Sequence, residues 1–110
     1  MQSILPILSY IHKNYKTTSL SEVARLFYYE PAYLSKEIKK RTGKGYTDIV
    51  RGLRLDEAKR LLRNTELNMD KVAEQAGYRN EVHFFREFRS KVGGTPGAYR
   101  RNQKNTEYLE

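Results

Sequence analysis

The sequence has no cysteine, which excludes disulfides and cysteine-ligated zinc from the fold. Its two histidines are isolated from each other, so neither a metal site nor a cofactor is expected. No apolar stretch is long enough to span a bilayer, and the residues after Met1 do not form a signal peptide. These absences favour a soluble, intracellular protein that works without a metal, a cofactor or a membrane.

Acidic residues are in the minority. The chain carries 13 Asp and Glu against 21 Lys and Arg, so its net charge is +8 and its isoelectric point is near 9.8. A protein with this balance attracts polyanions. Charge alone leaves three kinds of partner open, namely nucleic acid, a membrane surface and an acidic protein.

Strand-like alternation is nearly absent, whereas turn signals divide the 110 residues into short amphipathic helices. We therefore expect one domain with an all-α fold of about seven helices. The expected helices cover about 4–15, 20–27, 31–42, 46–63, 69–76, 81–92 and a short segment that opens at Thr95-Pro96. The first should bury Ile4, Leu5, Leu8 and Ile11. From Asn102 onward we expect a polar, frayed tail, in which Leu109-Glu110 can be a cloning remnant.

One sequence pattern occurs twice in the chain. At an offset of 49 residues, Ser19, Val23, Ala24 and Tyr29 match Asn68, Val72, Ala73 and Tyr78. One extra residue then enters the second copy, and at an offset of 50 Leu34, Lys36, Ile38, Lys39 and Gly43 match Phe84, Arg86, Phe88, Arg89 and Gly93. All amphipathic helices share apolar positions, but matching caps, closing glycines and cations are harder to obtain by coincidence. Each copy thus predicts a short capped helix, a tight turn and a longer helix, which is the helix-turn-helix plan.

The two turns differ in one residue. In the second copy Gly77 can adopt a positive φ, whereas Tyr28 occupies the same place in the first copy. Either the first turn is built differently, or a non-glycine residue bears strain there.

The longer helix of each copy is expected to bury one stripe and to expose a matching one. In the first copy Leu34 and Ile38 face the core, opposite Ala32, Lys36 and Lys39, with Ser35 at the margin. In the second copy Phe84, Phe88 and Val92 face the core, opposite Val82, Arg86 and Arg89. Solvation explains exposed cations, but contact with a thymine methyl group better explains an exposed Val82 or Ala32. Phe85 can make such a contact or be partly core.

The helix expected at 46–63 carries two apolar stripes. The first consists of Tyr46, Ile49, Val50 and Leu53. The second is turned by about 140° and consists of Leu55, Ala58, Leu61 and Leu62. One half can therefore pack on each helix-turn-helix unit, and its length of roughly 27 Å is comparable with the ~34 Å turn of B-DNA. Two helices joined in this way can enter successive major grooves.

Several segments of the chain, most of them in its second half, resemble those of a known protein family. They are Leu53-Arg54-Leu55-Asp56-Glu57-Ala58-Lys59-Arg60-Leu61-Leu62, Val72-Ala73, Gly77-Tyr78, Phe84-Phe85-Arg86-Glu87-Phe88-Arg89 and Gly94-Thr95-Pro96-Gly97-Ala98-Tyr99-Arg100, preceded by Val23-Ala24, Tyr33-Leu34-Ser35-Lys36 and Gly43. Over roughly residues 3–101 the chain resembles the DNA-binding domain of the AraC/XylS family of bacterial transcriptional regulators. We therefore expect a domain at 1–101, with a first unit at about 3–43, a linker helix at 46–63 and a second unit at 68–101, and a tail at 102–110.

The resemblance implies that the third and sixth helices read DNA from their starts and middles. Carried over residue by residue, the base-reading candidates are Ala32, Ser35, Lys36, Glu81, Val82, His83, Phe85 and Arg86. The phosphate-binding candidates are Lys39, Lys40 and Arg89.

Several of these roles have alternatives. Lys36 or Arg86 can reach guanine O6 and N7, and arginine is the better fork. Glu81 can accept from cytosine N4 or complement the start of its helix. His83 can meet a phosphate or a base, or be an exposed polar residue. Because Ala32 is small, we expect the first unit to position the domain and the second to specify sequence.

Two other classes of protein compete with DNA binding. An enzyme is not expected, because no nucleophile with a base and no phosphate-cradling glycine loop is visible, whereas a module for an acidic protein partner stays open. The resemblance implies sequence-specific binding of double-stranded DNA, regulation of transcription as an activator or as a repressor, RNA polymerase as a partner and a cytoplasmic, nucleoid-associated location. The start within helix-forming residues favours a C-terminal fragment of a larger regulator, whose sensing or dimerising domain lies outside this chain.

Overall fold

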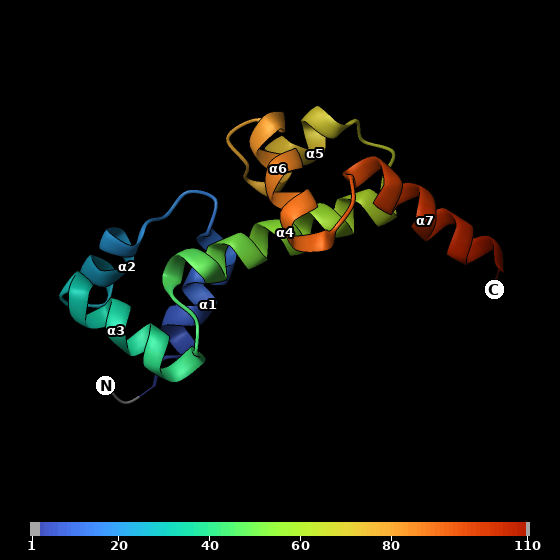
Figure 1. Ribbon diagram of the computed structural model, residues 1–110. Coiled ribbons are helices and arrows are strands. Elements are labelled where there is room, and N and C mark those ends of the chain that lie inside the picture. The colour runs from blue at the N-terminus through green and yellow to red at the C-terminus, as the bar shows by residue number, and fades with distance from the viewer. Residues whose placement is uncertain (1–2, 110) are drawn as a thin grey trace. The chain divides into compact units, whose positions relative to one another are not determined.

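The computed structural model describes the backbone of residues 3–109 and the side chains of residues 3–104. Over this part of the chain it contains seven helices and no strand (Figure 1). The helices are α1 (Leu5–Asn14), α2 (Leu20–Leu26), α3 (Pro31–Thr42), α4 (Tyr46–Asn64), α5 (Met69–Ala76), α6 (Glu81–Val92) and α7 (Pro96–Leu109). The all-α fold class is confirmed. None of the helices in the described range combines the length and the apolar character that a membrane crossing requires.

The chain divides into two compact units, Met1–Leu53 and Arg54–Glu110. In the first unit α2 packs on α3, and α1 packs on α2. In the second unit α5 packs on α6, and α6 packs on α7. Each unit therefore contains one helix-turn-helix pair, as the internal repeat predicts.

The core of the first unit lies between α1, α2, α3 and the first half of α4. Its buried residues are Ile4, Ile7, Ile11, Val23, Ala24, Leu34, Ile38 and Val50. The expectation that Leu5 faces this core is wrong, because Leu5 is 71% exposed and Ile7 is buried instead. Ile7 lies three residues after Ile4 on the same helix face, whereas Leu5 is turned by about 100° from it.

The core of the second unit centres on two aromatic side chains of α6. Phe84 and Phe88 are fully buried and meet edge to face, with ring centroids 5.8 Å apart. Tyr99 of α7 packs on Phe88 in the same manner at 5.5 Å. The other buried members are Ala58, Leu61, Leu62, Val72, Ala73, Ala76 and Tyr78. Val92, which the helical pattern places in the core, is only partly buried at the last turn of α6.

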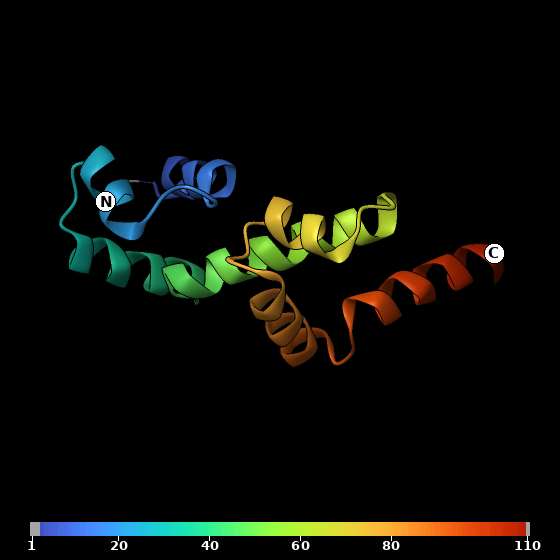
Figure 2. The same cartoon turned by 90° about the horizontal axis from the view of Figure 1, so that it is seen from above.

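The long helix α4 supplies side chains to both cores and is uninterrupted in both views (Figures 1 and 2). The first core receives Tyr46, Ile49, Val50 and Leu53. The second core receives Leu55, Ala58, Leu61 and Leu62. These are the two stripes that the sequence predicts, so the change of stripe along α4 marks a change of packing partner.

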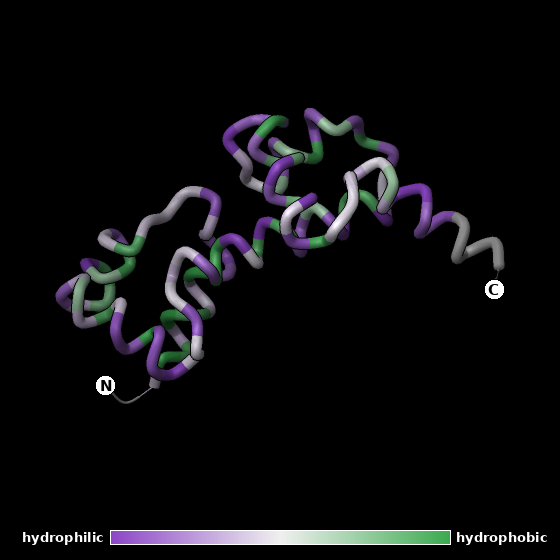
Figure 3. The backbone as a smooth tube through the Cα atoms, viewed as in Figure 1, coloured by the Kyte–Doolittle hydropathy of each residue, from purple (hydrophilic) through white to green (hydrophobic). Residues whose placement is uncertain are grey.

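The expectation of a short seventh helix and a frayed tail at 102–110 is wrong, because α7 continues to Leu109. Pro96 suits the first position of the helix, and the hydroxyl of Thr95 accepts from the Ala98 N–H at 3.1 Å. After Gly97 no glycine or proline interrupts the chain, so nothing local ends the helix. Figure 3 shows that the last coloured part of the chain before its C-terminal end is hydrophilic. Glu110, part of the suggested cloning remnant, lies outside the described residues.

Candidate nucleic-acid interface

The turns of the two helix-turn-helix pairs share one backbone geometry. In the first turn the Tyr29 N–H donates to the Ala24 carbonyl at 2.8 Å, and the equivalent bond of the second turn measures 2.9 Å. These are six-to-one hydrogen bonds of a Schellman-type helix end. The residue before each donor has a positive φ, 63° at Tyr28 and 98° at Gly77. Of the two alternatives for the first turn, the strained one is therefore observed.

The longer helix of each pair begins differently. The side chain of Asn80 caps α6 by accepting from the His83 N–H at 2.8 Å. The carboxylate of Glu30 caps α3 by accepting from the Tyr33 N–H at 3.0 Å. A carboxylate at a helix start complements the helix dipole, but its charge repels a phosphate that approaches the same place. Each start thus carries one carboxylate, Glu30 at the cap of α3 and Glu81 in the first turn of α6.

The candidates on α3 lie on the face that the helical pattern predicts. Ala32, Lys36, Lys39 and Lys40 are exposed, and Ser35 is half-buried. The opposite face of the helix is fully buried in the core of the first unit. The accessible side of α3 therefore carries Ala32 and the exposed ring of Tyr33 near its start and lysines farther along.

The candidates on α6 show a similar division. Val82, Arg86 and Arg89 are exposed, whereas Glu81, His83 and Phe85 are half-buried. Val82 keeps 68% of its surface accessible, although it is apolar. Phe85 packs against the core and meets Phe84 edge to face, with ring centroids 5.7 Å apart. Phe85 is therefore partly core, as one of its two interpretations has it.

A hollow of about 310 Å³ lies at the start of α6. It is lined by Arg79, Asn80, Val82, His83 and Arg86. Two guanidinium groups, an imidazole, an amide and an apolar side chain thus surround one space. Guanidinium groups suit phosphates and guanine edges, and an apolar side chain suits a thymine methyl group. The chemistry of this lining fits the edge of a base pair flanked by phosphates.

Arg79 is a lining residue that the sequence reasoning missed. It is the extra residue of the second copy, placed directly before the Asn80 cap, and the first copy has no counterpart. The side chain of Arg79 is exposed, and its guanidinium group adds to the positive charge of the hollow. The change of offset within the repeat was the signal that could have revealed it.

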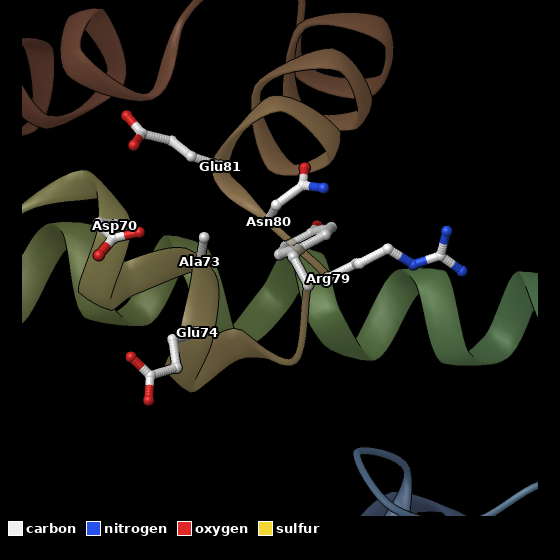
Figure 4. Close-up of a pocket in the computed structure, with 7 residues that line it drawn as sticks. Asp70, Ala73, Glu74, Arg79, Asn80 and Glu81 are labelled. Atoms are coloured by element: carbon white, nitrogen blue, oxygen red, sulfur yellow. The ribbon is translucent and has the colours of Figure 1, made fainter.

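Acidic side chains line an adjacent hollow of about 200 Å³, which also borders Arg79. They are Asp70 and Glu74 of α5 and Glu81 of α6. Figure 4 shows the side chain of Arg79 extended away from all three. Glu81 lies in the first turn of α6, where its charge complements the helix start. This placement favours the structural interpretation of Glu81 over contact with a cytosine.

Comparison with known proteins finds relatives that contain helix-turn-helix domains. A helix-turn-helix domain family matches residues 23–102. The chain is 35% identical over 104 residues to the HTH-type transcriptional regulator YobQ of Bacillus subtilis (strain 168). This match covers 94% of this chain and 42% of YobQ. It is also 34% identical over 100 residues to the HTH-type transcriptional regulator YtdP of the same strain. This match covers 90% of this chain and 13% of YtdP. The chain therefore spans less than half the length of these curated relatives.

Solved structures share the fold. The C-terminal domain of AraT, a response regulator from Geobacillus stearothermophilus, matches with a TM-score of 0.84 at 31% identity, covering 90% of this chain and 84% of that one. The DNA-binding domain of the global transcriptional factor AdpA has the same fold, with a TM-score of 0.85 at 20% identity over 97% of both chains. The chain belongs to the AraC-type helix-turn-helix family, whose domains bind DNA and regulate transcription and are not enzymes.

Proposed function

We propose that the chain binds double-stranded DNA with sequence specificity, and that α6 supplies most of the base discrimination. In this proposal α3 chiefly positions the domain on the DNA backbone. The observation that carries the proposal is the hollow at the start of α6, where Arg79, His83 and Arg86 surround the exposed Val82. The corresponding part of α3 has an acidic cap and the small side chain of Ala32.

Each base-reading candidate has a chemical role in this proposal. Arg86 is the candidate for guanine O6 and N7, because its planar fork matches the two acceptors. Val82 is the candidate for a thymine methyl group. On α3, Lys36 and Ser35 can donate to base edges, although lysine offers a point charge rather than a fork. Phe85 is expected to support α6 through the core more than to touch a base.

The phosphate-binding candidates lie farther along both helices. Lys39, Lys40 and Arg89 are exposed, and the last turns of α3 and α6 are basic. Contacts between cationic side chains and phosphates dominate the affinity for DNA but carry no sequence information. We add Arg79 to this set, because its exposed guanidinium group borders the candidate base-reading surface.

The proposal extends to the protein that contains this domain. A first unit at 3–43, a linker helix at 46–63 and a second unit at 68–101 would place α3 and α6 in successive major grooves of one duplex. Because the relatives are much longer, we propose that the domain serves a larger regulator in the bacterial cytoplasm, associated with the nucleoid. That regulator would activate transcription by contact with RNA polymerase, and another of its domains would sense a signal or dimerise.

Selection from a random duplex library, followed by footprinting, tests the proposal. We expect one enriched sequence and protection over about two major grooves. Binding of an acidic protein is the second candidate function, because the net charge of +8 also suits it. Salt weakens the charged contacts of both functions, so the two are separated by the dependence of affinity on DNA sequence at constant salt. Equal affinity for selected and random duplexes would reject sequence-specific binding.

A further inference from the structure

His83 is held by two neighbours. Its Nε2 lies 3.4 Å from Oε2 of Glu87, one turn farther along α6. Its ring meets the ring of Tyr78 edge to face, with centroids 5.5 Å apart. Tyr78 is buried in the core of the second unit, so the imidazole rests on a rigid support. His83 nevertheless keeps 37% of its side chain exposed and lines the hollow at the start of α6.

Glu87 is largely removed from water. Only 9% of its side chain is exposed, and its Oε1 atom is buried without a hydrogen-bond partner. A buried carboxylate is unfavourable unless a donor or a cation compensates its charge. The His83 ring, which carries a positive charge only when it is protonated, lies 3.4 Å from Oε2. The two side chains therefore form one unit, which is buried at the Glu87 end and open to the hollow at the His83 end.

The first copy of the repeat lacks this unit. On α3, Tyr33 stands in the place of the histidine and Glu37 in the place of the glutamate. The aromatic contact persists, because Tyr29 packs on Tyr33 with ring centroids 6.0 Å apart. The glutamate, however, pairs with Arg41 at 3.3 Å. Of the two copies, α6 is thus the one with an imidazole at this place.

We propose that Glu87 is a positioning residue for DNA reading, which holds Nε2 of His83 so that Nδ1 is the ring nitrogen that contacts DNA. The inference rests on the proposed role of α6. In the neutral ring, donation of Nε2–H to the carboxylate leaves Nδ1 as an acceptor. Next to DNA the protonated ring is favoured, because Glu87 and the phosphates are both negative. Nδ1–H then donates to an acceptor on DNA, either a phosphate oxygen or a purine N7.

Charges of both signs surround His83. Arg79 and Arg86 line the same hollow, and Glu87 lies beside Nε2 of the ring. Acidic groups of α5 and α6 line the adjacent hollow, namely Asp70, Glu74 and Glu81. In a complex, phosphates that pair with the two arginines neutralise them and bring negative charge beside the ring, so DNA binding is expected to take up a proton at His83.

The test measures affinity for one selected duplex between pH 6 and pH 8 at constant salt. The unaltered protein should bind more tightly as the pH falls, by up to about tenfold per pH unit for one linked proton. Glu87→Gln and His83→Gln should flatten this dependence. Glu37→Gln, at the matched position of α3, and His12→Gln, at the other histidine of the chain, should leave it unchanged.

Circular dichroism establishes that each variant is folded before its affinity is compared. A merely structural role for Glu87 predicts weaker binding by one factor at every pH, and that result would overturn the inference. Duplexes with single base-pair changes distinguish the two acceptors. If Nδ1 contacts a purine N7, His83→Gln should lose the preference for one base pair. If Nδ1 contacts a phosphate, His83→Gln should weaken binding to all duplexes equally. If the unaltered protein shows no preference among duplexes, the proposed function fails. If it shows a preference but no pH dependence, the inference alone fails.

Discussion

Replacement of Tyr28 by glycine is expected to stabilise the protein. Tyr28 holds a φ of 63° in the turn of the first helix-turn-helix pair, while 94% of its surface is exposed to solvent. The hydrogen bond from the Tyr29 N–H to the Ala24 carbonyl, 2.8 Å long, keeps the chain in that turn. The second copy of the repeat makes the same turn with Gly77. The strain at Tyr28 thus comes from its Cβ and not from a different backbone.

The magnitude follows from two opposing terms. A left-handed conformation is unfavourable by about 1–2 kcal/mol for a residue with a Cβ, and glycine removes most of that strain. Glycine also gives the unfolded chain more freedom, which offsets about 0.4–1 kcal/mol. The exposed ring of Tyr28 contributes little packing, so its loss changes the balance only slightly. The expected net stabilisation is about 0.5–1 kcal/mol.

Urea unfolding, followed by circular dichroism, measures this difference. Tyr28→Ala is the matched control, because it removes the ring but keeps the Cβ, and its stability should stay within about 0.5 kcal/mol of the unaltered protein. Gly77→Ala should destabilise the equivalent turn of the second unit. Equal stabilities for Tyr28→Gly and Tyr28→Ala would refute the argument from backbone strain.

Four further predictions concern the DNA surface and α7. Arg86→Ala should lose about 1–3 kcal/mol of discrimination at one base pair, measured with single-substituted duplexes. Lys39→Ala should weaken binding to all duplexes similarly and lower the slope of affinity against salt by about one, and Arg79→Ala should do the same. Lys104 donates from Nζ to Glu66 at 2.8 Å, and this bond lowers the pKa of the Glu66 carboxyl. The pair therefore stabilises α7 above the ordinary carboxyl pKa and ceases to do so as the pH falls through the lowered value. Melting curves should show Glu66→Gln less stable than the unaltered protein near pH 7, and the two should become equal once the pH is below the lowered pKa of Glu66. A difference that persists in strong acid would contradict this.

Much of the fold could be predicted because its signals are local. Ser19 and Asn68 cap α2 and α5 through their side chains, as their positions before apolar runs indicate. Gly43 and Gly93 end α3 and α6 with positive φ, which glycine adopts without strain. The repeat then follows from these caps and from the spacing of buried residues, and the shift of stripe along α4 follows from helical geometry alone.

Other features were missed, two because a local signal was misjudged and one because it depends on contacts that no local pattern contains. The length of α7 was underestimated because a polar composition suggested fraying, although residues 98–109 contain no helix-breaking residue. The Glu30 cap of α3 was missed because glutamate is an uncommon N-cap. The spacing of His83 and Glu87 suits a helical pair, but the burial of Glu87 and the contact with Tyr78 arise only when α6 packs on its neighbours. The roles of the individual side chains toward DNA stay predictions.

The central claim is that α6 specifies sequence while α3 positions the domain. It is tested most directly by the binding free energies of a complete set of single base-pair variants of the selected duplex, at fixed salt. The account predicts that base-pair changes within one groove segment each weaken binding by about 1–3 kcal/mol. In the Arg86→Ala variant, the change at one of these positions should no longer weaken binding. Losses of equal size in two groove segments, unaffected by Arg86→Ala, would contradict it.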